Sequence, residues 1–232
     1  MNIAMWSGPR NLSTAMMYAF AARSDFEVVD EPFYGAYLAA TGLKHPMREE
    51  IIASMERDPH RVGNMLAVAS NLYSKQMTQH MLEGFPRDWF SAVRHAFLIR
   101  HPARVVASYA AKREKPVLDD IGFRQQAEIF EQVRAMGQVP VVVDSFDIRA
   151  DPERTLRKLC GALGLDWTPA MLSWPQGGHA SDGVWAAHWY AAVHASPGFA
   201  APEGDLPEID AELRPIVDAA MPYYEALAVH RL

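Results

Sequence analysis

The residues best suited to chemistry lie in a short loop near the beginning of the chain. Residues 3–6 form an apolar run, residues 15–20 have an apolar helical pattern, and between them the chain reads Ser7-Gly8-Pro9-Arg10-Asn11-Leu12-Ser13-Thr14. This order predicts a strand, a tight loop and the start of a helix. A helix N-terminus attracts anions, and the charge of Arg10 and the hydroxyls of Ser13 and Thr14 would add to that attraction. The same residue types also cap helices that bind nothing, so the loop alone leaves both interpretations open.

The loop differs from the phosphate loop of magnesium-dependent nucleotide hydrolases at the positions that do their chemistry. Against the pattern G-x-x-x-x-G-K-[ST], Gly8 matches, whereas Ser13, Thr14 and Ala15 stand where Gly, Lys and the metal-binding hydroxyl belong. Hydrolysis of ATP with magnesium is therefore not expected. The histidines also lack the spacing to carboxylates or cysteine that a metal site needs, so we assign no metal.

A second pair of polar residues follows the fourth apolar run of the chain. Residues 96–99 lead directly into Arg100, and Pro102 can open a helix on which Ser108 falls about two turns along. An arginine at the end of a strand and a serine on the next helix can both reach one phosphate group. Arg100 and Ser108 are therefore predicted to bind a second phosphate.

Short apolar runs and helical patterns alternate along the chain and must position these side chains. The apolar runs lie at residues 3–6, 28–30, 72–77, 96–99 and 139–143. Because the runs are continuous rather than alternately polar, they are typical of strands covered by helices on both faces. We therefore predict an α/β fold, a three-layer sandwich with a mostly parallel central sheet, and active residues at the carboxyl ends of its strands.

The later part of the chain predicts helices and one irregular segment. Asp151, which can cap a helix, and Gly164, which can end one, predict a helix between them. Residues 119–136 predict one longer amphipathic helix, and residues 210–232 a closing helix interrupted near Pro222. Residues 167–207, rich in Trp, His, Gly and Pro, predict a lid or annex over the edge of the sheet.

Together the two phosphate motifs resemble those of sulfotransferases that use 3′-phosphoadenosine-5′-phosphosulfate (PAPS). Arg10 stands three positions ahead of the hydroxyl pair Ser13-Thr14, as a basic residue does in the 5′-phosphosulfate loop of that family. The run from Arg100 to Ser108 is similar to the family's 3′-phosphate motif, Arg-Asn/Asp-Pro-x-x-x-x-x-Ser, with His101 as one substitution. Residues 142–165 add the strand, acidic turn, Asp-Pro helix and Leu-Gly that the family carries next.

The resemblance implies a P-loop NTPase-like sulfotransferase fold, PAPS as the sulfuryl donor and 3′-phosphoadenosine 5′-phosphate (PAP) as the product. It places the nucleotide on residues 8–14, Arg100 and Ser108. Members of the family often add a C-terminal basic-glycine stretch, whereas residues 183–190 of this chain contain neither Arg nor Lys. We expect His188 or an aromatic face to take its place.

Sulfuryl transfer needs positive charge on the leaving group and a base for the acceptor proton. Arg10 suits the leaving group, and Lys75 could neutralise the sulfuryl oxygens. Glu31 is the first candidate for the base because it follows the second predicted strand, and some carbohydrate-type sulfotransferases carry a similar Glu-Pro there. His80 is the second candidate, since cytosolic members keep a catalytic histidine in the third-strand region.

Composition limits the remaining possibilities. The 232 residues suit a single sulfotransferase-like domain, and the net charge of −6 argues against nucleic acid as the main partner. One cysteine, Cys160, excludes an internal disulfide. Because the N-terminus lacks the features of a signal peptide and no run of 18 apolar residues occurs, we predict a cytoplasmic protein without a membrane span.

The acceptor is predicted to be a small-molecule or carbohydrate-like hydroxyl or amine. Residues 33–65 and 167–199, whose aromatic side chains indicate a partly apolar pocket, are expected to bind it. Two alternatives stay open at this point. One is a P-loop nucleotide kinase or other phosphotransferase, and the other is a nucleotide-binding protein without catalytic turnover.

Overall fold

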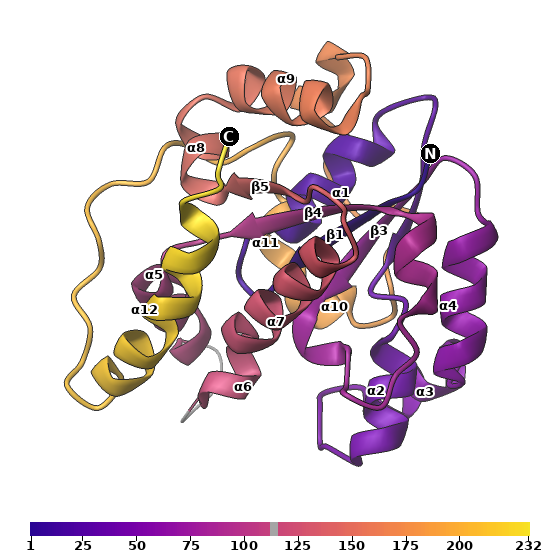
Figure 1. The fold of residues 1–232 in the computed structure, drawn as a ribbon. Helices are drawn as coiled ribbons and strands as arrows, with labels where there is room; N and C mark the ends of the chain where they lie inside the picture. Colours follow the sequence, from indigo (N-terminus) through magenta and orange to yellow (C-terminus); the bar gives the residue numbers. More distant parts are fainter. Residues whose placement is uncertain (112–115) are drawn as a thin grey trace.

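A computed structural model describes residues 1–111 and 116–232 of the chain. Its centre is a parallel sheet of five strands, as the sequence predicted, and the strand order is β2-β3-β1-β4-β5 (Figure 1). The strands are β1 (Ile3–Ser7), β2 (Glu27–Asp30), β3 (Leu72–Met77), β4 (Arg94–Ile99) and β5 (Val141–Asp144). Because all five are parallel, the loops that follow them meet at one edge of the sheet.

Alternating side chains of the strands divide the interior into two cores. Ile3 and Met5 of β1 face the first core, whereas Ala4 and Trp6 face the second. The first core is covered by α1 (Ser13–Ala21), α8 (Ser145–Ala150) and α9 (Pro152–Leu163); the second is covered by α4 (Pro59–Val68), α7 (Phe123–Ala135) and α12 (Arg214–Ala228). Helices on both faces of the sheet give the predicted three-layer sandwich.

Shorter helices surround this sandwich near the carboxyl edge of the strands (Figure 1). They are α2 (Tyr34–Thr41), α3 (Arg48–Ser54), α5 (Pro102–Ala110), α6 (Leu118–Ile121), α10 (Ala186–Trp189) and α11 (Ala191–His194). The 3₁₀ turns lie at Thr78–His80, at Asp88–Ala92 just before β4, and at Pro169–Leu172. No helix in the described ranges is long and apolar enough to cross a bilayer. Cys160 is fully buried in the first core.

The capped helix predicted before Gly164 is confirmed. Asp151 accepts a hydrogen bond from the Arg154 amide at 3.1 Å, and Gly164 ends α9 in the left-handed conformation with φ of 74°. The strand predicted from residue 139 begins two residues later. Val139 is 90% exposed and precedes Pro140, which has no amide hydrogen for a ladder.

Two other helix predictions were wrong. The single helix expected over residues 119–136 is divided at Gly122, whose left-handed backbone (φ 71°) ends α6 and whose carbonyl accepts a hydrogen bond from Thr78 Oγ1 at 2.9 Å. The expected interruption near Pro222 is absent, because α12 continues through this residue. Burial of Val217, Ala220 and Leu227 stabilises the helix more than one lost hydrogen bond weakens it.

Candidate functional site

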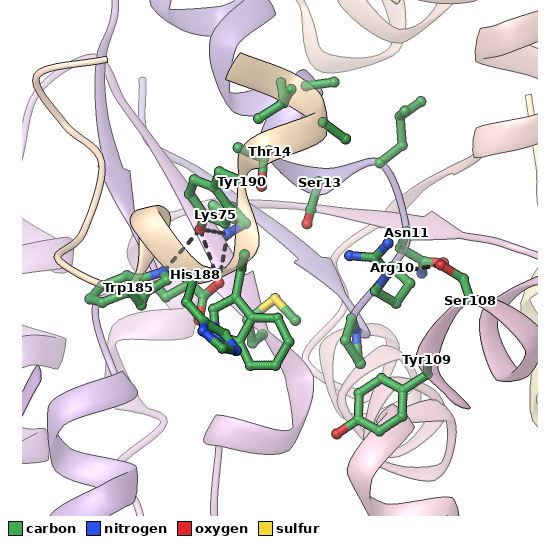
Figure 2. Close-up of a pocket in the computed structure, with 18 of the residues that line it drawn as sticks. Arg10, Asn11, Ser13, Thr14, Lys75, Ser108, Tyr109, Trp185, His188 and Tyr190 are labelled. Carbon is green, nitrogen blue, oxygen red and sulfur yellow. Dashed lines mark hydrogen bonds and ion pairs between the residues drawn. The ribbon is translucent and has the colours of Figure 1, made fainter. Parts of the chain in front are cut away.

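A cavity of about 440 Å³ lies at the carboxyl edge of the sheet (Figure 2). Its wall is made by the loop after β1, by the ends of β2, β3 and β4, by α5, and by residues 185–200. Every residue that the sequence assigned to catalysis or nucleotide binding lines this cavity, except Gly8. A Cβ atom on Gly8 would lie 2.3 Å from the Ile121 carbonyl oxygen, so this glycine permits the close approach of two backbones.

The loop after β1 has a backbone that suits an anion. Arg10 and Leu12 are left-handed, with φ of 61° and 67°, and Asn11 between them is not. Such alternation directs successive amide groups toward one concavity. Helix α1 begins at Ser13 without a side-chain cap or an acidic residue in its first turn, so its first amide groups lack intrahelical partners.

Of four consecutive residues in the loop, the side chains of the first two hold the loop in place and those of the last two face the cavity. The Asn11 side chain donates to the Leu98 carbonyl at 2.9 Å and ties the loop to β4, and the Leu12 side chain packs against the first core. These two residues therefore contribute to an anion site mainly through their backbone. The hydroxyls of Ser13 and Thr14 lie at the cavity wall between Arg10 and Tyr190 (Figure 2).

The two predicted phosphate motifs meet at Arg10. Its Nε donates to Ser108 Oγ at 2.8 Å, and Arg100 Nη1 donates to the Arg10 carbonyl oxygen at 2.6 Å. Arg100 thus stabilises the left-handed backbone of the loop as well as facing the cavity. Burial and the nearby charge of Arg100 lower the pKa of Arg10 from its usual value.

A second group of charges, which we call the acidic cluster, consists of Asp30, Glu31 and Lys75 with the Tyr190 hydroxyl. Lys75 Nζ lies 2.8 Å from Asp30 Oδ1 and 2.6 Å from Glu31 Oε1, and it also contacts the Tyr190 hydroxyl. The Lys75 side chain is 1% exposed and lies within β3. Three partners occupy its three ammonium hydrogens, an arrangement that favours holding Glu31 over binding a substrate oxygen.

Burial and neighbouring charges set the protonation of this cluster. Burial would lower the pKa of Lys75, but the charges of Asp30 and Glu31 outweigh it and raise that pKa above its usual value. Burial raises the pKa of Glu31, and the Asp30 charge adds to this rise while Lys75 opposes it. Glu31 also has a φ of 45°, a left-handed conformation that is uncommon for residues other than glycine.

His80 lies beside Glu31 but is enclosed by aromatic rings. Its ring centroid is 4.4 Å from that of Tyr34 and 4.7 Å from that of Tyr37, both in stacked geometry. His80 Nδ1 is 3.7 Å from Glu31 Oε2. Burial, followed by the charges of His45 and Lys75, holds the pKa of His80 well below its usual value, so the ring is neutral near pH 7.

Sequence reasoning did not find two members of the site. Tyr190 donates its hydroxyl to Asp30 Oδ2 at 2.8 Å and accepts a hydrogen bond from Trp185 Nε1 at 3.0 Å. Asp30, the last residue of the predicted second strand, was given no role. The adjacent carboxylates were a usable signal for Asp30, whereas Tyr190 follows no strand and carries no local signal.

Comparison with known proteins places this geometry in context. A family model described as a sulfotransferase domain matches residues 1–231. Two curated proteins of Arabidopsis thaliana, named branched-chain-amino-acid aminotransferase-like protein 1 and protein 2, are 36% and 33% identical over 98% of this chain. The chain spans only 42% and 41% of their lengths.

Solved structures show the same fold at low sequence identity. A sulfotransferase from Alicyclobacillus acidocaldarius matches with a TM-score of 0.56 and 13% identity, covering 100% of this chain and 96% of that one. The sulfotransferase domain from the curacin biosynthetic pathway matches with a TM-score of 0.52 and 15% identity, covering 95% and 97%. With the family match over nearly its whole length, the chain belongs to the sulfotransferase domain family.

Proposed function

We propose that the protein transfers a sulfuryl group from PAPS to a hydroxyl of a small-molecule acceptor. The observation that carries the proposal is that one cavity joins an uncapped, basic phosphate loop to a buried carboxylate. The loop suits the leaving phosphate, and the carboxylate suits the acceptor proton. An anion site and a proton acceptor at one cavity are what in-line group transfer to a hydroxyl requires.

The residues around the loop fit the donor nucleotide. Arg10, the amide groups after it, and the hydroxyls of Ser13 and Thr14 would hold the 5′-phosphosulfate, while Arg100 and Ser108 would hold the 3′-phosphate. The uncapped start of α1 supports this assignment, because its unpaired amide donors need an anion or water. The donor supplies the activated sulfuryl group, and the chain supplies its orientation.

Glu31 is proposed as the general base. Its carboxylate takes the acceptor hydroxyl proton as the acceptor oxygen bonds to sulfur and the bond from sulfur to the bridging oxygen breaks. Arg10 and the loop amides neutralise the charge that the departing 5′-phosphate gains. Lys75 positions Glu31, and the raised pKa of Glu31 makes it a stronger base than a carboxylate in water.

The lowered pKa and the enclosed ring of His80 make it the weaker candidate for the base, because a ring that resists protonation is a poor proton acceptor. Its ring stacks on Tyr34 and Tyr37, and its Nδ1, 3.7 Å from Glu31 Oε2, has no hydrogen-bond partner in the described ranges, so His80 contacts Glu31 through packing alone. The aromatic wall formed by Tyr34, Trp185 and Trp189 fits an acceptor with an apolar or sugar-like body.

The test is an acceptor screen with radiolabelled PAPS. The expected result is a labelled product and one equivalent of PAP for at least one alcohol acceptor, together with no phosphoryl transfer from ATP and magnesium. Transfer from ATP would support the phosphotransferase alternative. Tight PAP binding with no transfer to any of a wide range of acceptors would support a binding protein without turnover.

A further inference from the structure

A single carboxylate lies buried among three arginines next to the phosphate loop. The side chain of Glu203 is 1% exposed. It contacts Arg100 Nη2, lies 3.0 Å from Arg104 Nε, and accepts a hydrogen bond from Arg149 Nη1 at 2.7 Å. We call Arg100, Arg104 and Arg149, which come from the end of β4, from α5 and from α8, the arginine cluster.

Glu203 belongs to a strap, residues 199–210, that forms neither helix nor strand. The strap is part of the long connection from α11 to α12, seen at the left of Figure 1. Arg149 Nε donates to the Ala201 carbonyl at 2.8 Å, and Arg104 Nη2 donates to the Gly204 carbonyl. The strap is therefore fastened by the arginine cluster, and its residue Ala200 lines the cavity.

The pairing of Glu203 with Arg100 is incomplete. Elsewhere in the chain, Arg23 binds Asp25 through both donors of one guanidinium edge, with Nε at 2.9 Å and Nη2 at 2.8 Å. Arg100 binds Glu203 through Nη2 alone, and its Nε is buried without a hydrogen-bond partner in the described ranges. Half of this guanidinium edge is thus left for a better matched acceptor.

The charges of the cluster are also unbalanced. Three guanidinium groups face one carboxylate, which leaves an excess of two positive charges in a mostly buried place. A phosphate monoester carries about −1.5 to −2 charge at pH 7 and has three acceptor oxygens. In place of the carboxylate it would reduce the excess from two positive charges to about 1 to 1.5, and its three acceptor oxygens match the number of guanidinium groups.

We propose that the arginine cluster and Ser108 together form the site for the 3′-phosphate of the nucleotide, and that Glu203 occupies the arginine cluster when no nucleotide is bound. The inference rests on the proposed function and adds Arg104 and Arg149 to the predicted Arg100 and Ser108. The 3′-phosphate takes the place of the Glu203 carboxylate at Arg100 Nη2 and pairs with the free Nε. Binding of a 3′-phosphorylated nucleotide then releases the strap at Glu203.

If Glu203 and the 3′-phosphate compete for the arginine cluster, removing the charge of Glu203 should strengthen the binding of PAP rather than weaken it. Glu203→Gln keeps the shape of the side chain but removes the competing charge, so PAP should bind about tenfold more tightly than to the wild type. AMP, which has no 3′-phosphate, should bind within about twofold of its wild-type affinity, as a distant group has little effect. Asp205→Asn, at an exposed residue of the same strap, is the matched control and should change neither affinity.

Isothermal titration calorimetry of the three proteins with PAP and AMP measures these affinities. If Glu203→Gln weakens PAP binding or leaves it unchanged, Glu203 serves only to fix the arginines, and the proposal is overturned. An equal gain for PAP and AMP also overturns it, because that result is general charge attraction. If the wild type binds PAP no better than AMP, the proposed function itself fails.

Hydrogen exchange of the wild type tests displacement without any substitution. Saturating PAP should speed amide exchange in residues 199–210, because the carboxylate that fastens the strap has lost its partners. AMP should leave this exchange unchanged. Slower or unchanged exchange in the strap with PAP bound means that Glu203 stays in place, which contradicts the proposal even where Glu203→Gln fails to fold.

Discussion

The acidic cluster and the arginine cluster lie on opposite sides of the phosphate loop, and both are built from buried ions. The first stands at the end of β2 and on the neighbouring part of β3, and the second at the end of β4 and on the helices that follow β4 and β5. The strand order places the loop after β1 between them. One sheet edge therefore carries the proposed proton acceptor on one side of the proposed nucleotide loop and the guanidinium groups of the arginine cluster on the other.

The two clusters differ in how completely their ions are paired. In the acidic cluster, Lys75 has three partners for its three hydrogens, so Glu31 is held in a fixed position. In the arginine cluster, one carboxylate is shared unevenly and one guanidinium donor has no partner in the described ranges. A fully paired cluster suits a group that must stay in place, and an incompletely paired cluster suits a group that exchanges.

The largest expected effect is on the acidic side. Glu31→Gln should reduce kcat by about two to four orders of magnitude, because the amide cannot accept the acceptor proton. PAP affinity should be unchanged, since the arginine side is intact. Initial rates with labelled PAPS and titration with PAP measure the two quantities separately.

Two measurements control this result: the pH profile of kcat/KM and the activity of the variant His80→Ala. Protonated Glu31 cannot act as a base, so kcat/KM should fall as pH decreases through the raised pKa of Glu31, and this limb should be missing in Glu31→Gln. His80→Ala should retain the limb. Near-normal turnover of Glu31→Gln together with a large loss in His80→Ala would assign the base to the histidine.

The second effect is on stability. Lys75→Met leaves Asp30 and Glu31 buried without their cation and should lower the free energy of unfolding by about 3 to 5 kcal/mol. Urea unfolding followed by circular dichroism measures this loss. Lys158→Met, at an exposed lysine of α9, is the matched control and should stay within about 0.5 kcal/mol of the wild type.

A small loss in Lys75→Met would mean that the acidic cluster is loosely paired, contrary to its three short contacts. The two clusters would then not differ in how completely their ions are paired. Activity distinguishes the roles further, because a variant that folds should show a low kcat with PAP binding close to normal.

The third effect concerns the basic side. Arg100→Ala should lower the affinity for PAP by about tenfold to a hundredfold, the usual result of removing a charge-assisted contact. The affinity for AMP should fall less, although Arg100 also holds the Arg10 carbonyl. Differential scanning fluorimetry and calorimetry with both nucleotides measure the selectivity, with Arg157→Ala on the exposed face of α9 as the control. Equal weakening of PAP and AMP would remove Arg100 from the 3′-phosphate site.

The sequence predicted what depends on short-range order. Arg10, Ser13 and Ser108 could be placed because a strand, a loop and a helix follow each other within a few residues. Glu203 and Tyr190 could not be placed, since they lie in irregular segments and meet Arg100 and Lys75 across 103 and 115 residues. The break at Gly122 had a local signal in the glycine itself, which ends α6 as Gly164 ends α9, whereas its hydrogen bond with the distant Thr78 had none.

The smallest expected effect is that of magnesium chelation. It tests whether arginines alone, without a metal ion, supply the positive charge around the transferred group. Phosphate-loop hydrolases hold magnesium through a hydroxyl at the position that Ala15 occupies here. The buried carboxylates on either side of the loop are all paired with cations, Asp30 and Glu31 with Lys75 and Glu203 with the arginine cluster, so they are poorly placed as metal ligands. Arg10 and Arg100 supply fixed positive charge in the same place. We therefore expect excess EDTA to leave kcat and KM for PAPS within about twofold of their values with magnesium, since no charge that the reaction uses is removed. Strong inhibition by EDTA that added magnesium reverses would show that the arginines do not suffice, and it would favour the phosphotransferase alternative.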